Sequence, residues 1–315
     1  MGQPATAVAA IDVGTNSVLL TVARRGADGS LEVVRDRATI TRIGRGVDRT
    51  GTLAPAGIEA SLEVLQDYVR EARAHGATKI AAVGTSALRD ARNGDAFLKP
   101  AAGILGSEVE VITGDREARL TFLGATRGLD LDHDEVTVLD VGGGSTEVVR
   151  GRGRLVHGAV SLNVGSVRLL ERHVHHDPPR MEELRAAGRA AEETLSSGGL
   201  QLVPPLIGIA GTVTTLAAML QGLDEYDPAR IHGARIEPSA LDDLIERMAA
   251  ISTEERARLP GLDPRRADVI IVGAVIVQAA IAQAGGGAMI VSNGGVRLGL
   301  VDELLGPRDE CWSPV

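Results

Sequence analysis

The feature that most constrains the fold is a repeated stretch of strand, acid and glycine turn. Residues 7–26 are AVAAIDVGTNSVLLTVARRG, and residues 137–153 are TVLDVGGGSTEVVRGRG. Each copy has an apolar run, Asp-Val-Gly, small residues, a second β-branched run and a basic glycine turn. The copies lie about 130 residues apart, far more than one solenoid repeat, so they predict two similar halves that share a cleft. Chance similarity between short glycine-rich strands is the alternative.

Strand and helix patterns alternate along the rest of the chain. Residues 55–75 have helical spacing after Pro55, and residues 205–219 and 291–305 each indicate a strand, a glycine turn and a helix. This alternation predicts an α/β fold. A polar stretch near residues 124–135 predicts a boundary between domain I (1–125) and domain II (126–296). We expect a C-terminal helix, about 297–315, to pack back on domain I.

The composition narrows the class of protein. Hydrophobic residues make up 44% of the chain and aromatic residues only 2%, which is typical of parallel strands buried by Val, Ala, Leu and Ile. A formal charge of −9 argues against a protein that coats nucleic acid or binds a membrane surface. The single cysteine, Cys311, excludes an intramolecular disulfide and a CxxC metal site, and favours a cytoplasmic protein. The apolar run 269–284 is interrupted by polar residues and predicts a buried helix rather than a membrane span.

Glycine-rich turns indicate an anion site. Turns at 14–17, 142–145 and 208–212 follow apolar runs, and consecutive glycines expose backbone N–H groups that bind phosphate. An acid beside a phosphate is repelled unless a divalent cation lies between them, so Asp140 and Glu147 indicate Mg²⁺. The spacing matches neither the P-loop nor the Rossmann motif. Tight turns without a ligand are the alternative.

A set of motifs in this order resembles the exopolyphosphatase and guanosine pentaphosphate phosphohydrolase (Ppx/GppA) family. The motifs are IDVGTNSV, RIGRGVD, VGTSALRDA, ITGDREARLTFLGA, LDVGGGSTE, SLNVGSVRL, GIAGTVTTLAA, RRADVIIVGA and SNGGVRLG. The resemblance implies two RNase H-like domains of the actin, hexokinase and Hsp70 type around a phosphate-binding cleft.

The resemblance implies hydrolytic release of terminal orthophosphate from inorganic polyphosphate, with short chains expected because the chain stops after the two-domain core. Removal of the 5′ γ-phosphate of pppGpp is the alternative, and pppGpp or ppGpp could instead inhibit. A kinase or ATPase of the same fold and a non-catalytic sensor are further alternatives. The family implies a homodimer.

The resemblance also assigns roles to residues. Glu117 is the expected general base and Arg89 neutralises charge on the transferred phosphoryl group. Asp140, Glu147 and, through water, Asp12 would hold Mg²⁺, with Mn²⁺ as the alternative. Phosphate-binding residues are expected at Gly14, Thr15, Asn16, Ser17, Gly142, Gly143, Gly144, Ser145, Gly211 and Thr212. A solvated helix carboxylate is the alternative for Glu117, and a surface arginine is the alternative for Arg89.

Two other groups of side chains carry charge or metal-binding potential. Arginines 24, 25, 42, 45 and 49 could form a basic lane for a phosphate chain, although scattered solvated arginines are the alternative. The histidines of ERHVHHDPP, residues 171–179, lack the spacing of a zinc helix and indicate an exposed helix end.

Overall fold

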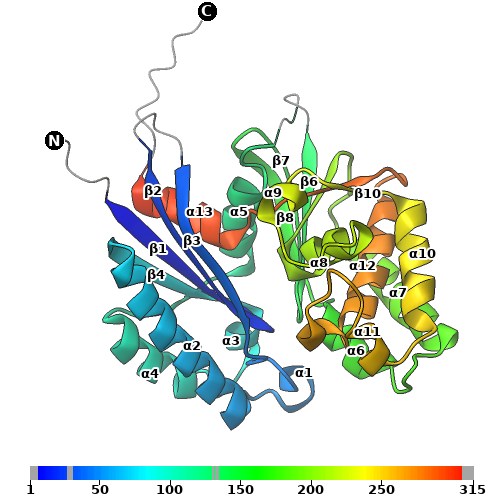
Figure 1. Cartoon of the computed structure of the whole chain (residues 1–315), viewed down its shortest axis with the longest axis horizontal. Coiled ribbons are helices and arrows are strands. Elements are labelled where there is room, and N and C mark those ends of the chain that lie inside the picture. The colour runs from blue at the N-terminus through cyan, green and yellow to red at the C-terminus, as the bar shows by residue number, and fades with distance from the viewer. Residues whose placement is uncertain (1–5, 27–30, 130, 132–134, 307–315) are drawn as a thin grey trace, which may run out of the picture.

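The computed structural model describes residues 6–26, 31–129, 131 and 135–306. They form two lobes that lie side by side, each built on one β-sheet with helices packed against it (Figure 1). The α/β class predicted from the alternation of strands and helices is confirmed.

The first sheet has the strand order β3-β2-β1-β4-β5. Its strands are β1 (Ala7–Val13), β2 (Ser17–Arg25), β3 (Leu31–Ile40), β4 (Ala77–Gly84) and β5 (Glu110–Val111). The central strand β1 pairs antiparallel with β2 and parallel with β4. The third strand therefore lies at an edge, whereas the strand that carries Asp12 lies at the centre of the sheet.

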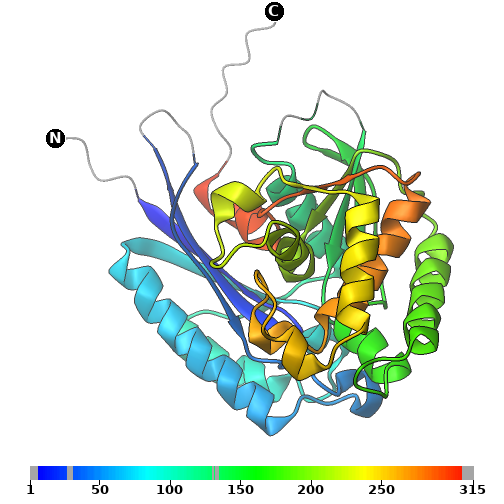
Figure 2. The ribbon, with the colours of Figure 1, turned by 45° about the vertical axis from the view of Figure 1, so that its right-hand side comes forward.

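Strand β1 is buried on both faces because its side chains alternate between two cores. Ala9 and Ile11 pack in a cluster with residues of α2 (Pro55–Ala74), which runs along one face of the sheet (Figure 2). Val8 and Ala10 belong to a second cluster that contains residues of α13 (Val296–Leu305). The near-continuous apolar run of this strand follows from its two covered faces.

The second sheet repeats the order of the first with one added strand. Its order is β10-β11-β9-β6-β7-β8, so the series β8-β7-β6-β9-β11 corresponds to β3-β2-β1-β4-β5. The strands are β6 (Val136–Val141), β7 (Thr146–Arg152), β8 (Leu155–Leu162), β9 (Leu206–Ile209), β10 (Arg235–Ile236) and β11 (Met289–Val291). Like β1, β6 pairs antiparallel with the next strand and parallel with β9. The prediction of two similar halves is confirmed.

The two copies of the repeat also share their register. Asp12 lies opposite Leu19 across β1 and β2, and Asp140 lies opposite Glu147 across β6 and β7. Each aspartate is therefore the residue before the last of its strand, just ahead of its glycine turn. Only the second copy places a carboxylate opposite its aspartate.

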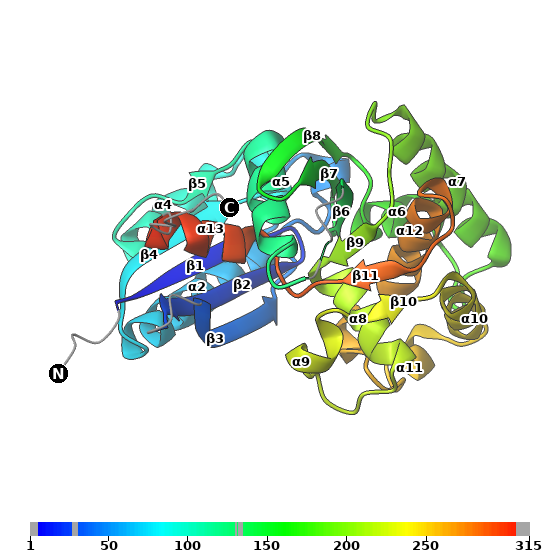
Figure 3. The same ribbon diagram turned by 90° about the horizontal axis from the view of Figure 1, so that it is seen from above.

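Helices α5 (Gly114–Ala125) and α13 lie between the sheets (Figure 3). Phe122 of α5 packs with Val138 and Val149 of the second sheet, whereas α13 packs on β1 and β2. The two helices touch so closely that a Cβ on Gly124 would lie 2.1 Å from the carbonyl oxygen of Gly295. These contacts place α13 on the first sheet, as expected for the C-terminal helix. Residues 307–315, the rest of the segment expected to form this helix, lie outside the described residues. The division of the chain into domain I and domain II stays a prediction.

Further helices complete the two lobes. They are α1 (Val47–Thr50), α3 (Ser86–Asp90), α4 (Asp95–Leu105), α6 (Ser166–His173), α7 (Met181–Ser197), α8 (Ala210–Leu220), α9 (Pro228–Ile231), α10 (Pro238–Ala249), α11 (Thr253–Arg256), α12 (Ile270–Gln283) and a 3₁₀ turn, Pro264–Arg266. The apolar run at 269–284 forms α12, which is buried among the helices of the second lobe. No helix in the described part of the chain combines the length and apolar character needed to cross a bilayer.

Candidate active site

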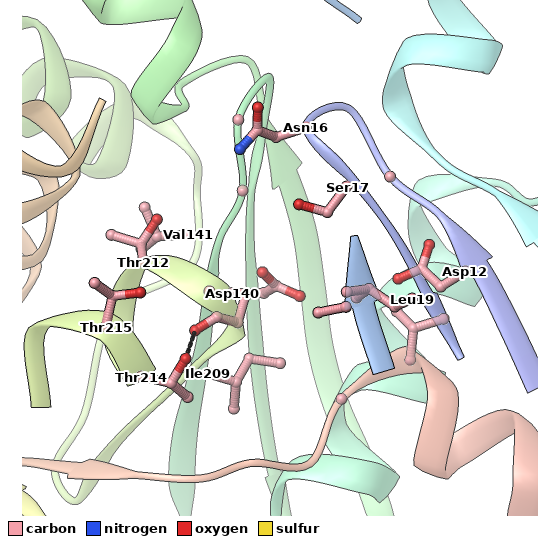
Figure 4. Close-up of a pocket in the computed structure, with 18 of the residues that line it drawn as sticks. Asp12, Asn16, Ser17, Leu19, Asp140, Val141, Ile209, Thr212, Thr214 and Thr215 are labelled. Carbon is pink, nitrogen blue, oxygen red and sulfur yellow. Dashed lines mark hydrogen bonds between the residues drawn. The ribbon is translucent and has the colours of Figure 1, made fainter. Parts of the chain in front are cut away.

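A cleft of about 750 Å³ lies between the two lobes. Both copies of the repeat, the start of α8 and the start of α13 line it. Asp12 from β1 and Asp140 from β6 point into it from opposite sides (Figure 4). This follows from strand alternation, because Asp12 shares the face of Val8 and Ala10, and Asp140 shares the face of Val138. The shared cleft predicted from the repeat is present.

The second glycine turn is held from behind by the start of α6. The carbonyl of Gly142 accepts a hydrogen bond from Ser166 N–H at 3.0 Å, and the carbonyl of Gly143 accepts from the N–H groups of Val167 and Arg168 at 2.9 and 3.1 Å. In a trans peptide the next N–H points away from its carbonyl. The N–H of Gly143, which follows the Gly142 carbonyl, therefore turns away from α6, and Gly143 is one of the residues that line the cleft.

The first glycine turn is held in the same way by the segment after β3. The carbonyl of Thr15 accepts from Gly44 N–H at 2.9 Å, and the carbonyl of Asn16 accepts from the N–H groups of Thr41 and Arg42, both at 3.0 Å. The turn thereby directs the N–H groups of Asn16 and Ser17 away from this segment. Both turns thus offer backbone donors of the kind that bind phosphate.

The cleft contains most of the expected phosphate-binding residues. Gly14, Thr15, Asn16, Ser17, Gly142, Gly143, Ser145, Gly211 and Thr212 line it. Gly144 does not line the main cleft: it lies behind the turn, where a Cβ would be 3.2 Å from Thr15 Oγ1 and 3.4 Å from Ser86 Oγ. Its lack of a side chain lets the two turns approach each other.

The acidic residues of the second lobe lie side by side, with Glu147 buried and Asp140 half-buried. Asp140 and Glu147 are opposite neighbours on β6 and β7, and Glu147 is only 2% exposed. Glu147 accepts a hydrogen bond from Ser161 Oγ at 2.7 Å. Burial, and then the charge of Glu147, raise the pKa of Asp140 well above its ordinary value. Burial likewise raises the pKa of Glu147. Two ionised carboxylates at this place need a compensating positive charge.

Asp12 faces this pair from the other lobe and lacks a partner for one oxygen. Its Oδ1 atom is buried and accepts no hydrogen bond from any described residue. Burial raises its pKa to about 7, although Arg297 acts in the opposite direction. An orphaned carboxylate oxygen that faces two neighbouring carboxylates is a donor set that suits a hard divalent cation.

The acids do not form a closed cage by themselves. In the parts of the chain that are described, no three His, Cys, Asp or Glu side chains are close enough together to hold a metal. Mg²⁺ commonly takes one or two protein carboxylates and completes its shell with water and phosphate oxygens. The residues therefore fit a cation that is shared with a phosphate ligand.

Glu117 lies in the first turn of α5 and points into the same cleft. It is 5% exposed and lines the cleft with Asp12, Asp140 and Glu147. Arg89 of α3 donates from Nη1 to Glu117 Oε2 at 3.0 Å and to the carbonyl of Ile112 at 2.9 Å. Burial, and then the nearby Glu147, raise the pKa of Glu117 to about 9 in spite of this arginine. Glu117 is therefore not a solvated helix carboxylate.

Arg89 differs from its expected place. It is held by Glu117 and by a backbone carbonyl, and it is not one of the residues that line the cleft. This geometry orients the Glu117 carboxyl group. Its expected role on the transferred phosphoryl group stays a prediction.

The third turn opens α8 toward the cleft. Ala210 has a left-handed backbone, φ +66°. The next residue, Gly211, packs so closely against Arg266 that a Cβ on Gly211 would lie 2.4 Å from Arg266 Nη2. The N-terminal N–H groups of an 11-residue helix favour an anion here. A strained residue before a glycine is typical of a backbone fixed by function.

The five arginines suggested for a basic lane do not line the cleft. Arg24 pairs with Glu32 at 2.8 Å, and Arg42 pairs with Asp268 at 3.0 Å. The arginines that line the cleft are instead Arg37, Arg266 and Arg297. Sequence reasoning missed these three because each reaches the cleft only through the tertiary fold.

Arg266 differs from the other two arginines of the cleft. Arg37 pairs with Glu71, and Arg297 pairs with Asp36. Within the described residues, Arg266 has no carboxylate partner, and its one side-chain hydrogen bond goes to Ser17 Oγ at 3.5 Å. Burial lowers its pKa. The sequence signal for Arg266 is the Arg265–Arg266 pair ahead of the apolar helix.

The histidine cluster contacts the first turn of α7. His176 Nδ1 lies 2.7 Å from Glu183 Oε1, and Glu183 also accepts from the backbone of Arg180 at the start of α7. The cluster therefore ties the end of α6 to α7, and none of its histidines lines the cleft.

Comparison with known proteins identifies the family. The sequence profile described as the Ppx/GppA phosphatase family matches residues 21–307. The chain belongs to the Ppx/GppA phosphatase family. The family assignment confirms the resemblance seen in the motifs and the prediction of an enzyme that hydrolyses phosphoric anhydrides.

Relatives of known name and structure support this assignment. The chain is 41% identical over 285 residues to a Mycobacterium tuberculosis protein named exopolyphosphatase 2, covering 87% of this chain and 89% of that one. The crystal structure of the Aquifex aeolicus Ppx/GppA member superposes with a TM-score of 0.81 at 36% identity, covering 96% of this chain and 98% of that one. An exopolyphosphatase-like protein superposes with a TM-score of 0.86 at 33% identity, covering 95% and 97%. The two-domain fold expected from the family is confirmed.

Proposed function

We propose that this Ppx/GppA protein is an exopolyphosphatase that releases terminal orthophosphate from inorganic polyphosphate. The observation that carries the proposal is the buried Glu117 carboxyl in a cleft that also contains two amide-lined turns and the carboxylates of Asp12, Asp140 and Glu147. The identity to a protein named exopolyphosphatase 2 supports it.

The phosphate end group lies, in this proposal, between the two glycine turns. The N–H groups of the first and second turns bind its oxygens, and Ser17 and Ser145 add hydroxyl donors. Arg266 supplies the one guanidinium of the cleft that has no carboxylate partner among the described residues. Because phosphoryl transfer depends mainly on positioning and charge neutralisation, these donors suit the reaction.

Water is the nucleophile, and Glu117 is the proposed base. A water oxygen attacks the terminal phosphorus, its proton passes to the Glu117 carboxylate, and the bond from phosphorus to the bridging oxygen breaks. The bridging oxygen leaves with its electron pair on the shortened polyphosphate. The hydrogen bond from Arg89 fixes which face of the Glu117 carboxyl meets the water.

A divalent cation, Mg²⁺ or Mn²⁺, would be held by Asp140 and Glu147, with Asp12 reaching it through water. When bound, it would supply positive charge to the phosphate oxygens and to the buried acids. A base must be ionised, and Glu117, whose pKa is about 9 in the protein alone, is largely protonated at neutral pH. Positive charge beside Glu147 would favour its ionised form.

We propose short polyphosphates as the preferred substrate. The lining of the cleft includes three more acids, Asp36, Asp224 and Asp263, as well as the exposed Tyr226. Asp36 pairs with Arg297, whereas Asp224 has no ion pair among the described residues. Carboxylates along the cleft oppose the binding of a long polyanion.

The test is orthophosphate release from polyphosphates of defined length, measured beside pppGpp and ATP with and without Mg²⁺. The proposal expects release from polyphosphate with water as acceptor and faster turnover of short chains. Faster release from pppGpp would support the guanosine pentaphosphate alternative, and phosphate transfer to an added hydroxyl acceptor would support a kinase. Absence of release from polyphosphate at any metal concentration would end the proposal.

A further inference from the structure

Each glycine turn is held by a segment that carries an arginine. In the first lobe, Arg42 N–H bonds the carbonyl of Asn16; in the second lobe, Arg168 N–H bonds the carbonyl of Gly143, and Arg168 Nε bonds the carbonyl of Gly144 at 2.6 Å. Both arginines follow the third strand of their sheet, β3 and β8. The repeat therefore places one arginine behind each turn.

Both side chains then cross to the other lobe. The guanidinium of Arg42 pairs with Asp268 at 3.0 Å and also donates to the carbonyl of Arg265. The guanidinium of Arg168 pairs with Asp48 and reaches Asp90 at 3.6 Å. Arg172 of α6 also pairs with Asp48, at 2.7 Å. Arginines thus link the lobes in both directions across the cleft.

The backbone of Arg42 indicates that this contact is not incidental. Arg42 has a left-handed conformation, φ +56°, which is unfavourable for a residue other than glycine. The conformation allows its N–H to bond Asn16 while its side chain meets Asp268. The side chain of Arg168 is only 11% exposed, so most of it is shielded from water. A strained backbone and a buried charge persist where the surrounding structure holds them in place.

We propose that Arg42 and Arg168 are positioning residues that hold the two phosphate-binding turns in register by linking each turn to the opposite lobe. This inference rests on the proposed function of the cleft as a phosphate site. Closing the cleft and aligning the donors become one event, because the residue that fixes each turn also binds the other lobe. Loss of a link leaves the turns intact in their own lobes but lets the lobes separate.

The first measurement is a double-mutant cycle on polyphosphate hydrolysis. Asparagine tolerates a left-handed backbone, so Arg42→Asn keeps the turn, and Asp268→Asn keeps the hydrogen bond that Asp268 Oδ1 accepts from Val269 N–H. Each variant should raise KM about fivefold and leave kcat within about twofold, because part of the free energy of substrate binding is then used to close the cleft. The double variant should be no worse than the single ones.

The matched control is the Arg24–Glu32 pair, which has similar chemistry within the first sheet and lies away from the cleft. Arg24→Gln should leave KM unchanged. For the second link, Arg168→Gln should raise KM more than Arg168→Lys, which keeps a charge near Asp48. Effects of Arg42→Asn and Asp268→Asn that multiply in the double variant, or a fall in kcat at constant KM, would overturn the proposal.

The second measurement does not depend on the substrate. Spin labels on the exposed Gln66 of α2 and Arg185 of α7, with Cys311 replaced by serine, report the distance between the lobes. The distance should lengthen or broaden in Arg42→Asn and in Arg168→Gln, but not in Arg24→Gln. An unchanged distance in both variants would overturn the inference even if the protein hydrolyses polyphosphate. A longer distance without any hydrolysis would uphold the link and reject the proposed function.

Discussion

Glu117→Gln is expected to stabilise the protein while it removes turnover. The carboxyl is 5% exposed, and burial raises its pKa from 4.5 to about 9. Folding at pH 7 therefore requires Glu117 to take up a proton that it has lost in the unfolded chain. Glutamine has nearly the same shape, can accept the hydrogen bond from Arg89 and has no such requirement.

The size of the effect follows from the pKa. Between pH 4.5, the ordinary pKa, and pH 7, the uptake of this proton lowers the free energy of unfolding of the wild type by about 3 kcal/mol, at ~1.4 kcal/mol per pH unit. That is an upper value, and it corresponds to a rise in Tm of about 5 °C for a chain of this size. The difference between variant and wild type should vanish below pH 4.5, grow as pH rises and level off above about 9.

Thermal unfolding from pH 4 to pH 9, without and with Mg²⁺, measures this. Mg²⁺ should raise the Tm of the wild type more than that of the variant, because a cation favours the ionised carboxyl. Turnover of the variant should fall about 100-fold, as expected for a lost base. The control is Glu63→Gln on the exposed side of α2, which should leave Tm unchanged. A variant that melts with the wild type at every pH would refute the raised pKa of Glu117.

Three further substitutions test other parts of the site and the fold. Asp140→Asn should raise the Mg²⁺ concentration needed for half-maximal activity about tenfold, since it removes a proposed ligand; an unchanged Mg²⁺ titration would exclude that role. Arg266→Gln should raise KM for polyphosphate about tenfold, because Arg266 is the cleft arginine that has no carboxylate partner among the described residues and is therefore available to phosphate. Circular dichroism should show that the fold of this variant is intact. Gly124→Ala should cost more than about 3 kcal/mol by denaturant unfolding, as its Cβ would lie 2.1 Å from the Gly295 carbonyl oxygen, whereas Gly103→Ala, where no atom lies within 4 Å, should be neutral or stabilising.

Local signals in the sequence predicted the framework of the fold. The apolar runs of β1 and β6 and the glycines after Asp12 and Asp140 are features of neighbouring residues, so the repeat was visible without a structure. The helix at 55–75 was equally visible, because its spacing and its first-turn proline act locally, and it forms α2, Pro55–Ala74.

Elements and contacts that depend on distant residues could not be predicted. Helix α6 has eight residues, three of them basic, and is stabilised by packing on α7 and α12 rather than by its own propensity. The partners of Arg89 and Arg42 lie 28 and 226 residues away. Sequence spacing gives no information on such pairs, so both arginines were expected in the phosphate path.

The position of α13 has a consequence for how this protein is made. The core that contains Val8 and Ala10 is completed by Val296, Leu300 and Val301. During translation, the whole first sheet and then residues 126–295 leave the ribosome before α13, the helix that covers the inner face of this sheet, has been synthesised. Until then the nascent N-terminal lobe exposes an apolar surface, so it cannot finish folding as it emerges and must be kept from aggregating during translation.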